Sequence, residues 1–554
     1  MSASAMGVSS ASESSDQKIS GQTHSFTGTR VLIRLASRRD RIMLPVWVYV
    51  LIAASASTAY SFKGLYPTES SREQFAATIN ATPSTIAIYG AVHATSLGGI
   101  TAWRIAVLAA TLAGIMSVLM VVRHTRAEEQ TGRQELVGAT SVGHRAPLAA
   151  ALGIALVANL GVALGTAVVL PFLGCGFVGG LALGLAIGTC GIFFTGLAAV
   201  TAQIAETSRA ANGLASAALG VFYLARAAAD ASGYGWLMWC TPLGWVERVD
   251  AYGADRWWVL ALPLACALAF ATVATRLAAT RDLGAGLLAS RPGAARAGRD
   301  LRGAYGLSWR LHRGAVLGWS IGFLLGGAVT GYIAKDIVGV ITSSAQMERI
   351  ITEMGGQSGL VDAYLAAIMG IAGLIAAIYA VQAVLRARSE ETAGRAEPLL
   401  AGALGRVRWA SGHLAAALIG SAILLTATGL GAGLAHGLRM HDVSGQLPRV
   451  LGAALAQWPA VAVVAAIAAA LFGAAPRYAA GVAWGAVAVF LLLGQLGPVL
   501  KLGQAVMDVS PFSHVPKVPG GVFSWTPLGW LTLLGAALLV LGLAAFRRRD
   551  LQSE

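Results

Sequence analysis

The sequence predicts an all-α membrane protein with twelve transmembrane helices, arranged as two similar halves of six. Of its 554 residues, 56% are hydrophobic and only 12% are charged, whereas soluble globular domains carry about 25% charged residues. Apolar stretches of about 20 residues, the length that crosses the hydrocarbon layer, recur along the chain. A charged loop of the first half also recurs in the second half. Together these observations argue against a soluble protein.

The apolar stretches give the positions of the spans in chain order. In the first half we place them at 42–61, 102–122, 148–171, 177–204, 212–230 and 257–279. In the second half we place them at 314–334, 363–385, 411–435, 450–473, 478–498 and 527–546. The fifth span ends with Arg226 and Asp230, which lie four residues apart on one helix face and are therefore expected to pair.

Basic residues indicate which loops are cytoplasmic. Arginines cluster before the first span, after the second, between the sixth and seventh, after the eighth and at the C-terminus. By the positive-inside rule, both termini are cytoplasmic and the number of spans is even. Membrane topology thus explains the net charge of +14, and we expect no nucleic-acid partner. The excess of arginine over lysine, with abundant Ala and Gly, is typical of a GC-rich bacterial genome. Together with the spans, it leads us to expect a multi-pass protein of a bacterial plasma membrane.

The spans divide the chain into four parts. Residues 1–29 are rich in Ser and Thr and lack the apolar core of a signal peptide, so we expect a disordered tail. The first six-helix half covers 30–285, a cytoplasmic linker with an amphipathic segment covers 286–313, and the second half covers 314–554. The four cysteines form no metal-binding pattern, and the sequence leaves open whether Cys175 and Cys240 are bonded.

The most specific signal is a charged loop that occurs once in each half. Residues 126–135 read Arg-Ala-Glu-Glu-Gln-Thr-Gly-Arg-Gln-Glu, and residues 388–397 read Arg-Ser-Glu-Glu-Thr-Ala-Gly-Arg-Ala-Glu. One interpretation is a solvated loop that only obeys the positive-inside rule. That rule alone would not retain the acidic residues in both copies, so we favour a short helix that docks on a charged partner.

Two further matches lie near the same face of the membrane. The triplet Arg-Asp-Leu follows both the sixth span, at 281–283, and the twelfth, at 549–551. Arg38 and Arg41 before the first span match Arg310 and Arg313 before the seventh. These basic segments are amphipathic, with Arg34 on the same spacing, and would lie in the interface. They either carry motion into the spans or serve only as interfacial anchors.

Matching halves of one orientation form a parallel repeat, whose interface is the natural place for a translocation path; duplication without a path, as in a scaffold, is the alternative. The chain has no phosphate-binding loop of the P-loop type and no HExxH or GxSxG motif. The spans also hold few of the ionisable residues on which ion-coupled transporters depend. We therefore expect a transport subunit that is not itself an enzyme and holds no metal.

The chain resembles the bacterial polyketide-antibiotic (tetronasin-type) exporter permeases of the type-2 ABC transporter class, over about residues 30–554. The resemblance rests on the duplicated loops, the basic segments, the Arg-Asp-Leu triplets and the Pro-Phe-Ser-His-Val-Pro segment at 511–516. It implies two fused six-helix permease halves served by two copies of a separate ATPase subunit. ATP and Mg would be held by that partner, and this chain would bind no cofactor.

The resemblance also implies roles for individual residues. The duplicated loops would be coupling helices that dock on the ATPase, through Glu128, Glu129, Gly132, Arg133, Glu135, Glu390, Glu391, Gly394, Arg395 and Glu397. Elbow helices would contain Arg34, Arg38, Arg41, Arg310 and Arg313. The second and fifth spans of each half would line the substrate path, with Met116, Met120, Phe222, Tyr223, Met369, Tyr379, Trp484 and Phe490 as candidate contacts.

The expected function is therefore that of a permease subunit in an ATP-driven exporter. Its substrates would be amphiphilic drugs, antibiotics or lipid-like molecules, and membrane lipids would surround it. A proton-coupled drug transporter of the major facilitator type is the alternative, since it also has two halves of six spans. That family has an Asp-Arg before the Gly in a tight loop, whereas this chain has Glu128 and Arg133 in a much longer one.

Overall fold

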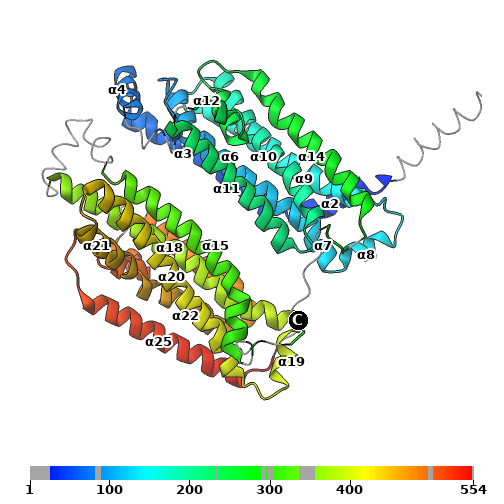
Figure 1. Cartoon of the computed structure of the whole chain (residues 1–554), viewed down its shortest axis with the longest axis vertical. Coiled ribbons are helices and arrows are strands. Elements are labelled where there is room, and N and C mark those ends of the chain that lie inside the picture. The colour runs from blue at the N-terminus through cyan, green and yellow to red at the C-terminus, as the bar shows by residue number, and fades with distance from the viewer. Residues whose placement is uncertain are drawn as a thin grey trace, which may run out of the picture. The chain divides into compact units, whose positions relative to one another are not determined.

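The protein is all-helical in the parts that the computed structural model describes, which are residues 25–81, 86, 89–232, 234–282, 284–287, 295, 296, 298, 301, 303–335, 356–496 and 503–551. No β-strand occurs among these residues. The chain divides into two compact units, residues 1–292 and 293–554, and each is described by itself (Figure 1). Residues 1–24 of the predicted tail and much of the predicted 286–313 linker lie outside the described residues.

The first unit is a helical bundle whose long helices coincide with the predicted spans. Its elements are α2 (Thr29–Arg39), α3 (Met43–Leu65), α4 (Glu69–Asn80), α6 (Leu97–His124), α7 (Arg126–Gln130), α8 (Arg133–Gly138), α9 (Ala146–Phe172), α10 (Phe177–Ile204), α11 (Ser208–Ser232), α12 (Gly235–Met238), α13 (Pro242–Arg248), η1 (Trp257–Leu260) and α14 (Ala261–Thr280). The duplicated loop forms α7 and α8, at the end of the bundle where α6 ends and α9 begins. We call this the loop end of the unit.

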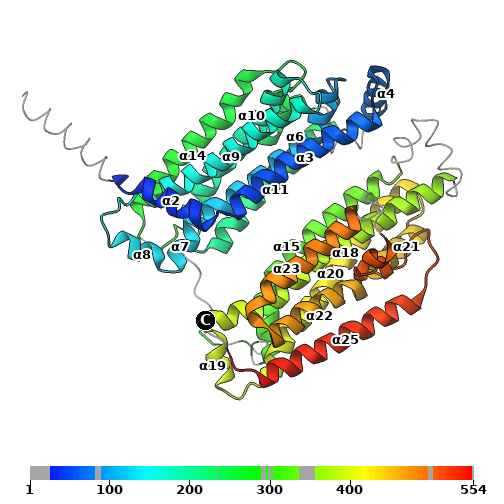
Figure 2. The same ribbon diagram turned by 180° about the vertical axis from the view of Figure 1, so that it is seen from behind.

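The second unit repeats this plan with altered helix boundaries. Its elements are α15 (Ala304–Ile333), α18 (Gly356–Thr392), α19 (Ala396–Leu400), α20 (Arg406–Met440), α21 (Val443–Leu455), α22 (Trp458–Ala474), α23 (Pro476–Leu496), α24 (Gln504–Met507), η3 (Pro511–His514) and α25 (Trp525–Arg548). The predicted tenth span is broken into α21 and α22. The predicted second elbow segment is not a separate helix, because α15 runs without a break through it and the seventh span (Figure 2).

Eleven helical stretches in the described parts are long and apolar enough to cross a membrane, against the twelve that the sequence predicts. The difference is α11, at the position of the predicted fifth span. This helix of 25 residues packs against α6 and α10, but Arg209, Arg226 and Asp230 lower its hydropathy. A multi-pass membrane protein is thus supported, whereas the count of twelve is not confirmed.

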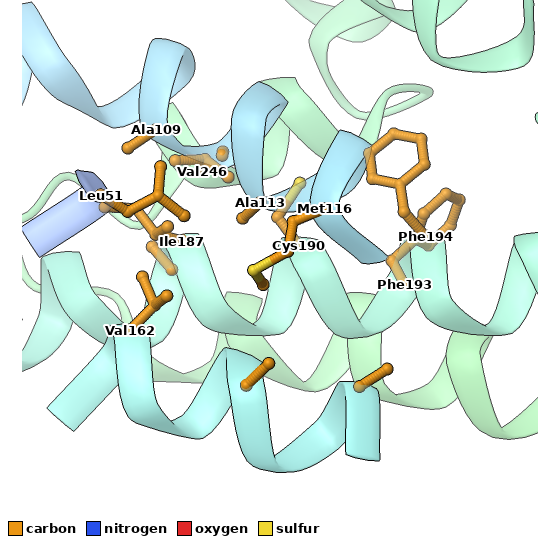
Figure 3. Close-up of a cluster of buried hydrophobic side chains, with 14 of the residues drawn as sticks. Leu51, Ala109, Ala113, Met116, Val162, Ile187, Cys190, Phe193, Phe194 and Val246 are labelled. Carbon is orange, nitrogen blue, oxygen red and sulfur yellow. The ribbon is translucent and has the colours of Figure 1, made fainter. Parts of the chain in front are cut away.

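The core of the first unit is built around α10, which lies between α6, α9 and α14. Figure 3 shows Met116 of α6 directed toward Cys190 of α10, with Phe193 and Phe194 further along α10. Within this apolar core Asn159 of α9 is fully buried, and its amide donates to the hydroxyl of Ser117 at 2.8 Å. This hydrogen bond ties α9 to α6 where no water can compete.

Glycines spaced four residues apart let α10 and α9 approach closely. A Cβ placed on Gly184 would lie 2.2 Å from the carbonyl oxygen of Ala163, and one on Gly188 would lie 2.9 Å from that of Asn159. In the second unit Gly327 and Gly331 of α15 meet α20 in the same way, with distances of 2.4 and 2.2 Å to backbone oxygens. Membrane helices commonly associate through such small residues, because lipid gives little hydrophobic driving force between them.

We predict that Gly184→Ala destabilises the protein by about 1–3 kcal/mol, the usual cost of overpacking. The added methyl group meets backbone, which cannot move aside without separating α9 from α10. Thermal unfolding of the purified protein in detergent measures this as a lower midpoint. Gly213→Ala on α11 is the matched control, because no atom lies within 4 Å of its Cβ position. Equal midpoints for the two variants would contradict the close approach.

Candidate functional site

In both copies of the charged loop, the glycine of the motif has the same backbone conformation. Gly132 and Gly394 both adopt the left-handed conformation, with φ of 71° and 69°. Glycine reaches this conformation without the steric cost that other residues meet. In the first unit the glycine separates α7 from α8, and in the second it ends α18 before α19. The glycine therefore sets the turn that places the second arginine of each motif.

In the first unit, the second glutamate of the motif is buried between two arginines. The side chain of Glu129 is 3% exposed, and it accepts hydrogen bonds from Arg126 at 2.6 Å and from Arg281 at 2.5 and 2.9 Å. Arg126 is itself fully buried and also donates to the carbonyl oxygens of Ala202 and Ala285, at 2.9 and 3.1 Å. This cluster joins the loop to the ends of α10 and α14.

The second unit contains the same cluster, built from the equivalent residues. The guanidinium of Arg549 donates to both carboxylate oxygens of Glu391, at 2.6 and 2.8 Å, and Arg388 lies 3.4 Å from the same carboxylate. Arg549 also lies over the rings of Phe472 and Phe546. We call these two clusters the loop clamps. The first consists of Arg126, Glu129 and Arg281, and the second of Arg388, Glu391 and Arg549.

The loop clamps join two sequence repeats that the sequence analysis treats separately. Arg281 and Arg549 are the arginines of the Arg-Asp-Leu triplets, and each binds the second glutamate of the loop motif in its own unit. Two of the residues predicted to dock on a partner, Glu129 and Glu391, thus have an internal role. The sequence offered one indication that the glutamate pairs with the triplet arginine, because both repeats are predicted to lie at the same face of the membrane.

The remaining charges of the motif lie nearer the surface, where Glu128 and Glu390 are partly exposed and the second arginines are exposed. Glu128 forms ion pairs with Arg39 of α2 and, at 3.7 Å, with Arg133. Glu390 pairs with Arg395 at 2.6 Å and with Arg386 at 3.7 Å. The two second arginines of the motif have 57% and 58% of their side chains exposed.

Exposed leucines accompany these charges. Leu136 of α8 is 74% exposed and Leu399 of α19 is 38% exposed, and both lie beside the exposed carboxylates Glu135 and Glu397. We call each such group an outer loop face. Its members are Glu128, Arg133, Glu135 and Leu136 in the first unit, and Glu390, Arg395, Glu397 and Leu399 in the second. An apolar side chain within a ring of charges is the composition of a protein-binding surface.

The predicted first elbow, α2, is attached to the loop of its unit. Besides the pair between Arg39 and Glu128, the buried carboxylate of Asp40 lies 2.6 Å from His124 and 3.1 Å from Arg123. A cavity of about 280 Å³ lies between α2 and α8, lined by both partners of the Arg39–Glu128 pair. Arg34, Arg38 and Arg41 are exposed on α2 and just after it.

The second basic segment differs from the first. Arg310 and Arg313 are exposed on α15, but this helix continues into the span. Between them His312 is buried, and its Nε2 lies 3.1 Å from Nδ1 of His413 on α20. The sequence did not predict this contact, because each histidine stands alone in its own segment.

Most of the predicted substrate contacts are buried inside their own unit. Met116, Met120, Met369, Tyr379 and Phe490 belong to the two hydrophobic cores. The hydroxyl of Tyr379, for example, donates to the carbonyl oxygen of Ala416 at 3.1 Å. Phe222 and Tyr223 are partly buried beside the first core, and Trp484 is exposed.

A further charged cluster lies at the opposite end of the first unit. The predicted pair of Arg226 and Asp230 is confirmed at 2.8 Å, and Glu247 of α13 contacts the same guanidinium. Burial raises the pKa of Glu247 above its ordinary value, although Arg226 opposes this shift. The spacing along α11 predicted the first contact, whereas the contact with α13 depends on tertiary structure.

The described residues contain no group of three or more side chains suited to a metal ion. All four cysteines are free thiols; Cys175 is buried and Cys240 is exposed. The charged side chains at the loop end form ion pairs. Such pairs suit the binding of a partner and the transmission of motion.

Comparisons with known proteins agree with this description. Residues 301–547 match a family model described as the C-terminal domain of the multidrug efflux system permease Rv1217c. Over 529 residues the chain is 43% identical to the multidrug efflux system permease protein Rv1217c of Mycobacterium tuberculosis. This similarity covers 95% of the chain and 96% of that protein.

We predict that Glu129→Gln destabilises the first unit by about 3–5 kcal/mol, because the buried Arg126 and Arg281 both lose their carboxylate, and that Arg281→Gln costs less, because Glu129 keeps its bond to Arg126. The double variant should lose less than the sum of the two, since both charges of the pair are then gone. Unfolding midpoints of the four proteins in detergent measure this coupling. Glu135→Gln, an exposed position in the same loop, serves as the control. Additive losses would contradict the clamp.

Proposed function

The chain belongs to the family of multidrug efflux system permeases represented by Rv1217c, and from this premise we propose that it is the permease subunit of an ATP-driven ABC exporter. In this proposal it moves amphiphilic drugs, antibiotics or lipid-like molecules out of a bacterial cell. Both termini and the loop ends of both units face the cytoplasm. The observation that carries the proposal is the outer loop face, which has the same charged positions of the motif in both units and an exposed leucine close to them in each.

The outer loop faces are the proposed docking sites for two copies of a separate ATPase subunit. Each face combines an exposed arginine, exposed carboxylates and an exposed leucine on a short helix. A solvated loop would have no reason to keep an apolar side chain among these charges in both units. The sequence has no P-loop of its own, so ATP and Mg would be held by the partner.

The loop clamps supply a route by which docking moves the spans. When the ATPase subunits close on ATP, each pushes an outer loop face. Because Glu129 is bound to Arg281, directly after α14, a displaced loop carries the end of α14 with it. Glu391 and Arg549 connect the second loop to α25 in the same way. The second and sixth spans of each half would therefore move together, and α2 follows through its own ion pairs.

The substrate path is assigned by exclusion. Side chains that are fully packed in one unit, such as Met116 and Met369, are already occupied by their neighbours. Phe222, Tyr223 and Trp484 keep part of their surface accessible and remain the proposed apolar contacts. The major facilitator alternative gains no support, because neither of the two matches is to that family.

We predict that the double variant Glu128→Gln with Glu390→Gln reduces drug-stimulated ATP hydrolysis and efflux by about tenfold, which corresponds to about 1.4 kcal/mol of lost docking energy. Each substitution removes the carboxylate that holds the second arginine of the motif in place. The measurement uses the permease co-expressed with its ATPase subunit, in vesicles. It also records co-purification at one permease to two ATPases.

Glu69→Gln with Glu73→Gln is the matched control, since it removes two carboxylates from α4 at the opposite end of the first unit. This control should leave both activities unchanged. Undiminished drug-stimulated hydrolysis and efflux in the Glu128 and Glu390 double variant would refute the docking role of the outer loop faces.

A further inference from the structure

A large cavity lies in the second unit, at the end opposite to its loop clamp. It has a volume of about 1280 Å³ and is enclosed by the end of α21, the start of α22, residues 518–523 and the first half of α25. The turn between α21 and α22 borders it, since Leu455, Ala456 and Trp458 are among its lining residues. In the first unit the corresponding α10 is unbroken, and the ring of Tyr252 packs against Gly179 and Gly180.

The cavity wall is mostly apolar, with Thr532 and one ionisable side chain, Arg449, among its lining residues. Its lining includes Trp458, Val518, Leu528 and Leu533, with Arg449 at the rim. The guanidinium of Arg449 is bonded to Asp362, and 43% of its side chain is exposed. A guanidinium has five N–H donors, and the bond to Asp362 uses one of them. An anionic acceptor can therefore bind at the rim without displacing Asp362.

The dimensions of the cavity match one leaflet of a bilayer. It follows α25 from Trp525 to Ala536, a length of about 16 Å at 1.5 Å per residue, and half of the hydrocarbon layer is about 15 Å thick. Phe523 and Trp525 are exposed at its rim, at the level where aromatic residues mark the membrane interface. Leu533 and Trp530 of α25 are also exposed, as on a helix that faces lipid.

From these observations we infer that the cavity binds an anionic phospholipid of the surrounding bilayer. One acyl chain lies along α25 and α22, and the phosphate of the headgroup accepts hydrogen bonds from Arg449. A zwitterionic lipid has the same chain, but its headgroup brings an ammonium group close to the guanidinium. The site therefore prefers a headgroup with a net negative charge. It lies at the end of the second unit opposite to the loop clamp and is therefore a binding site distinct from the duplicated loop faces.

The test uses the full-length protein in vesicles of equal parts phosphatidylglycerol and phosphatidylcholine. One lipid at a time carries a photoactivatable group on its acyl chain, and labelled peptides are identified by mass spectrometry. We expect phosphatidylglycerol to label residues 518–536 about fivefold more than phosphatidylcholine, which is the ratio that about 1 kcal/mol for one arginine near anionic lipid gives. Arg449→Gln should remove this preference, whereas Arg439→Gln, a nearby arginine stacked on Tyr332, should keep it.

A second variant tests the cavity independently of charge. Gly529 lines the cavity and has open space at its Cβ position, so Gly529→Trp should obstruct the cavity beside α25 and reduce labelling by both lipids. Gly481→Trp on α23, also an open position, is the matched control. Equal labelling by both lipids in the unmodified protein, or labelling that neither Arg449→Gln nor Gly529→Trp changes, would overturn the inference. Displacement of the lipid label by a transported drug would overturn it as well, by assigning the cavity to substrate.

Discussion

A carboxylate buried between arginines from distant parts of the chain fixes the loop end of each unit. Glu129 binds one arginine three residues earlier and another 152 residues later, and Glu391 repeats this arrangement. A buried charge is tolerated only when its partners are in place. The loop and the end of the last helix therefore cannot separate without a large cost in free energy. The left-handed glycine, the exposed arginine and the rest of the outer loop face lie within a few residues of this buried carboxylate.

Sequence reasoning predicted most of the helices, because a span of apolar residues is a strong and local signal. It was less reliable where polar or helix-breaking residues interrupt a span. The charged residues of α11 reduce its hydropathy, and the break before Trp458 divides the tenth span in two. The opposite error occurred at α15, where a change from basic to apolar composition suggested a boundary that the backbone does not have. The composition of a segment indicates whether it lies in lipid or in water, whereas the continuity of a helix depends on how it packs.

The duplicated charged loop was identified from the sequence, but the sequence did not show which of its residues are buried and which are exposed. Duplication identified the motif, yet all five charged or glycine positions of each copy appeared equivalent as docking residues. The structure separates Glu129 and Glu391, which are buried and bind the arginine of the Arg-Asp-Leu triplet, from Glu128 and Glu390, which are partly exposed and pair with the second arginine of their motif. Neighbouring residues on a helix point in different directions, and only the position of Arg281 or Arg549 decides which direction is the interior. The pair of His312 and His413 was missed for the same reason, since their contact is made between helices.

The continuity of α15 has a consequence for how far the two units of this chain differ. A helix of 30 residues is a rod of about 45 Å, and a rod that is displaced at one end tilts along its entire length. In the first unit the same region consists of two helices, α2 and α3, with a joint at residues 40–42 between them. A permease assembled from two identical chains would have two joints or two rods. The two units of this chain differ in this respect, because the first begins with two helices and the second with one continuous helix.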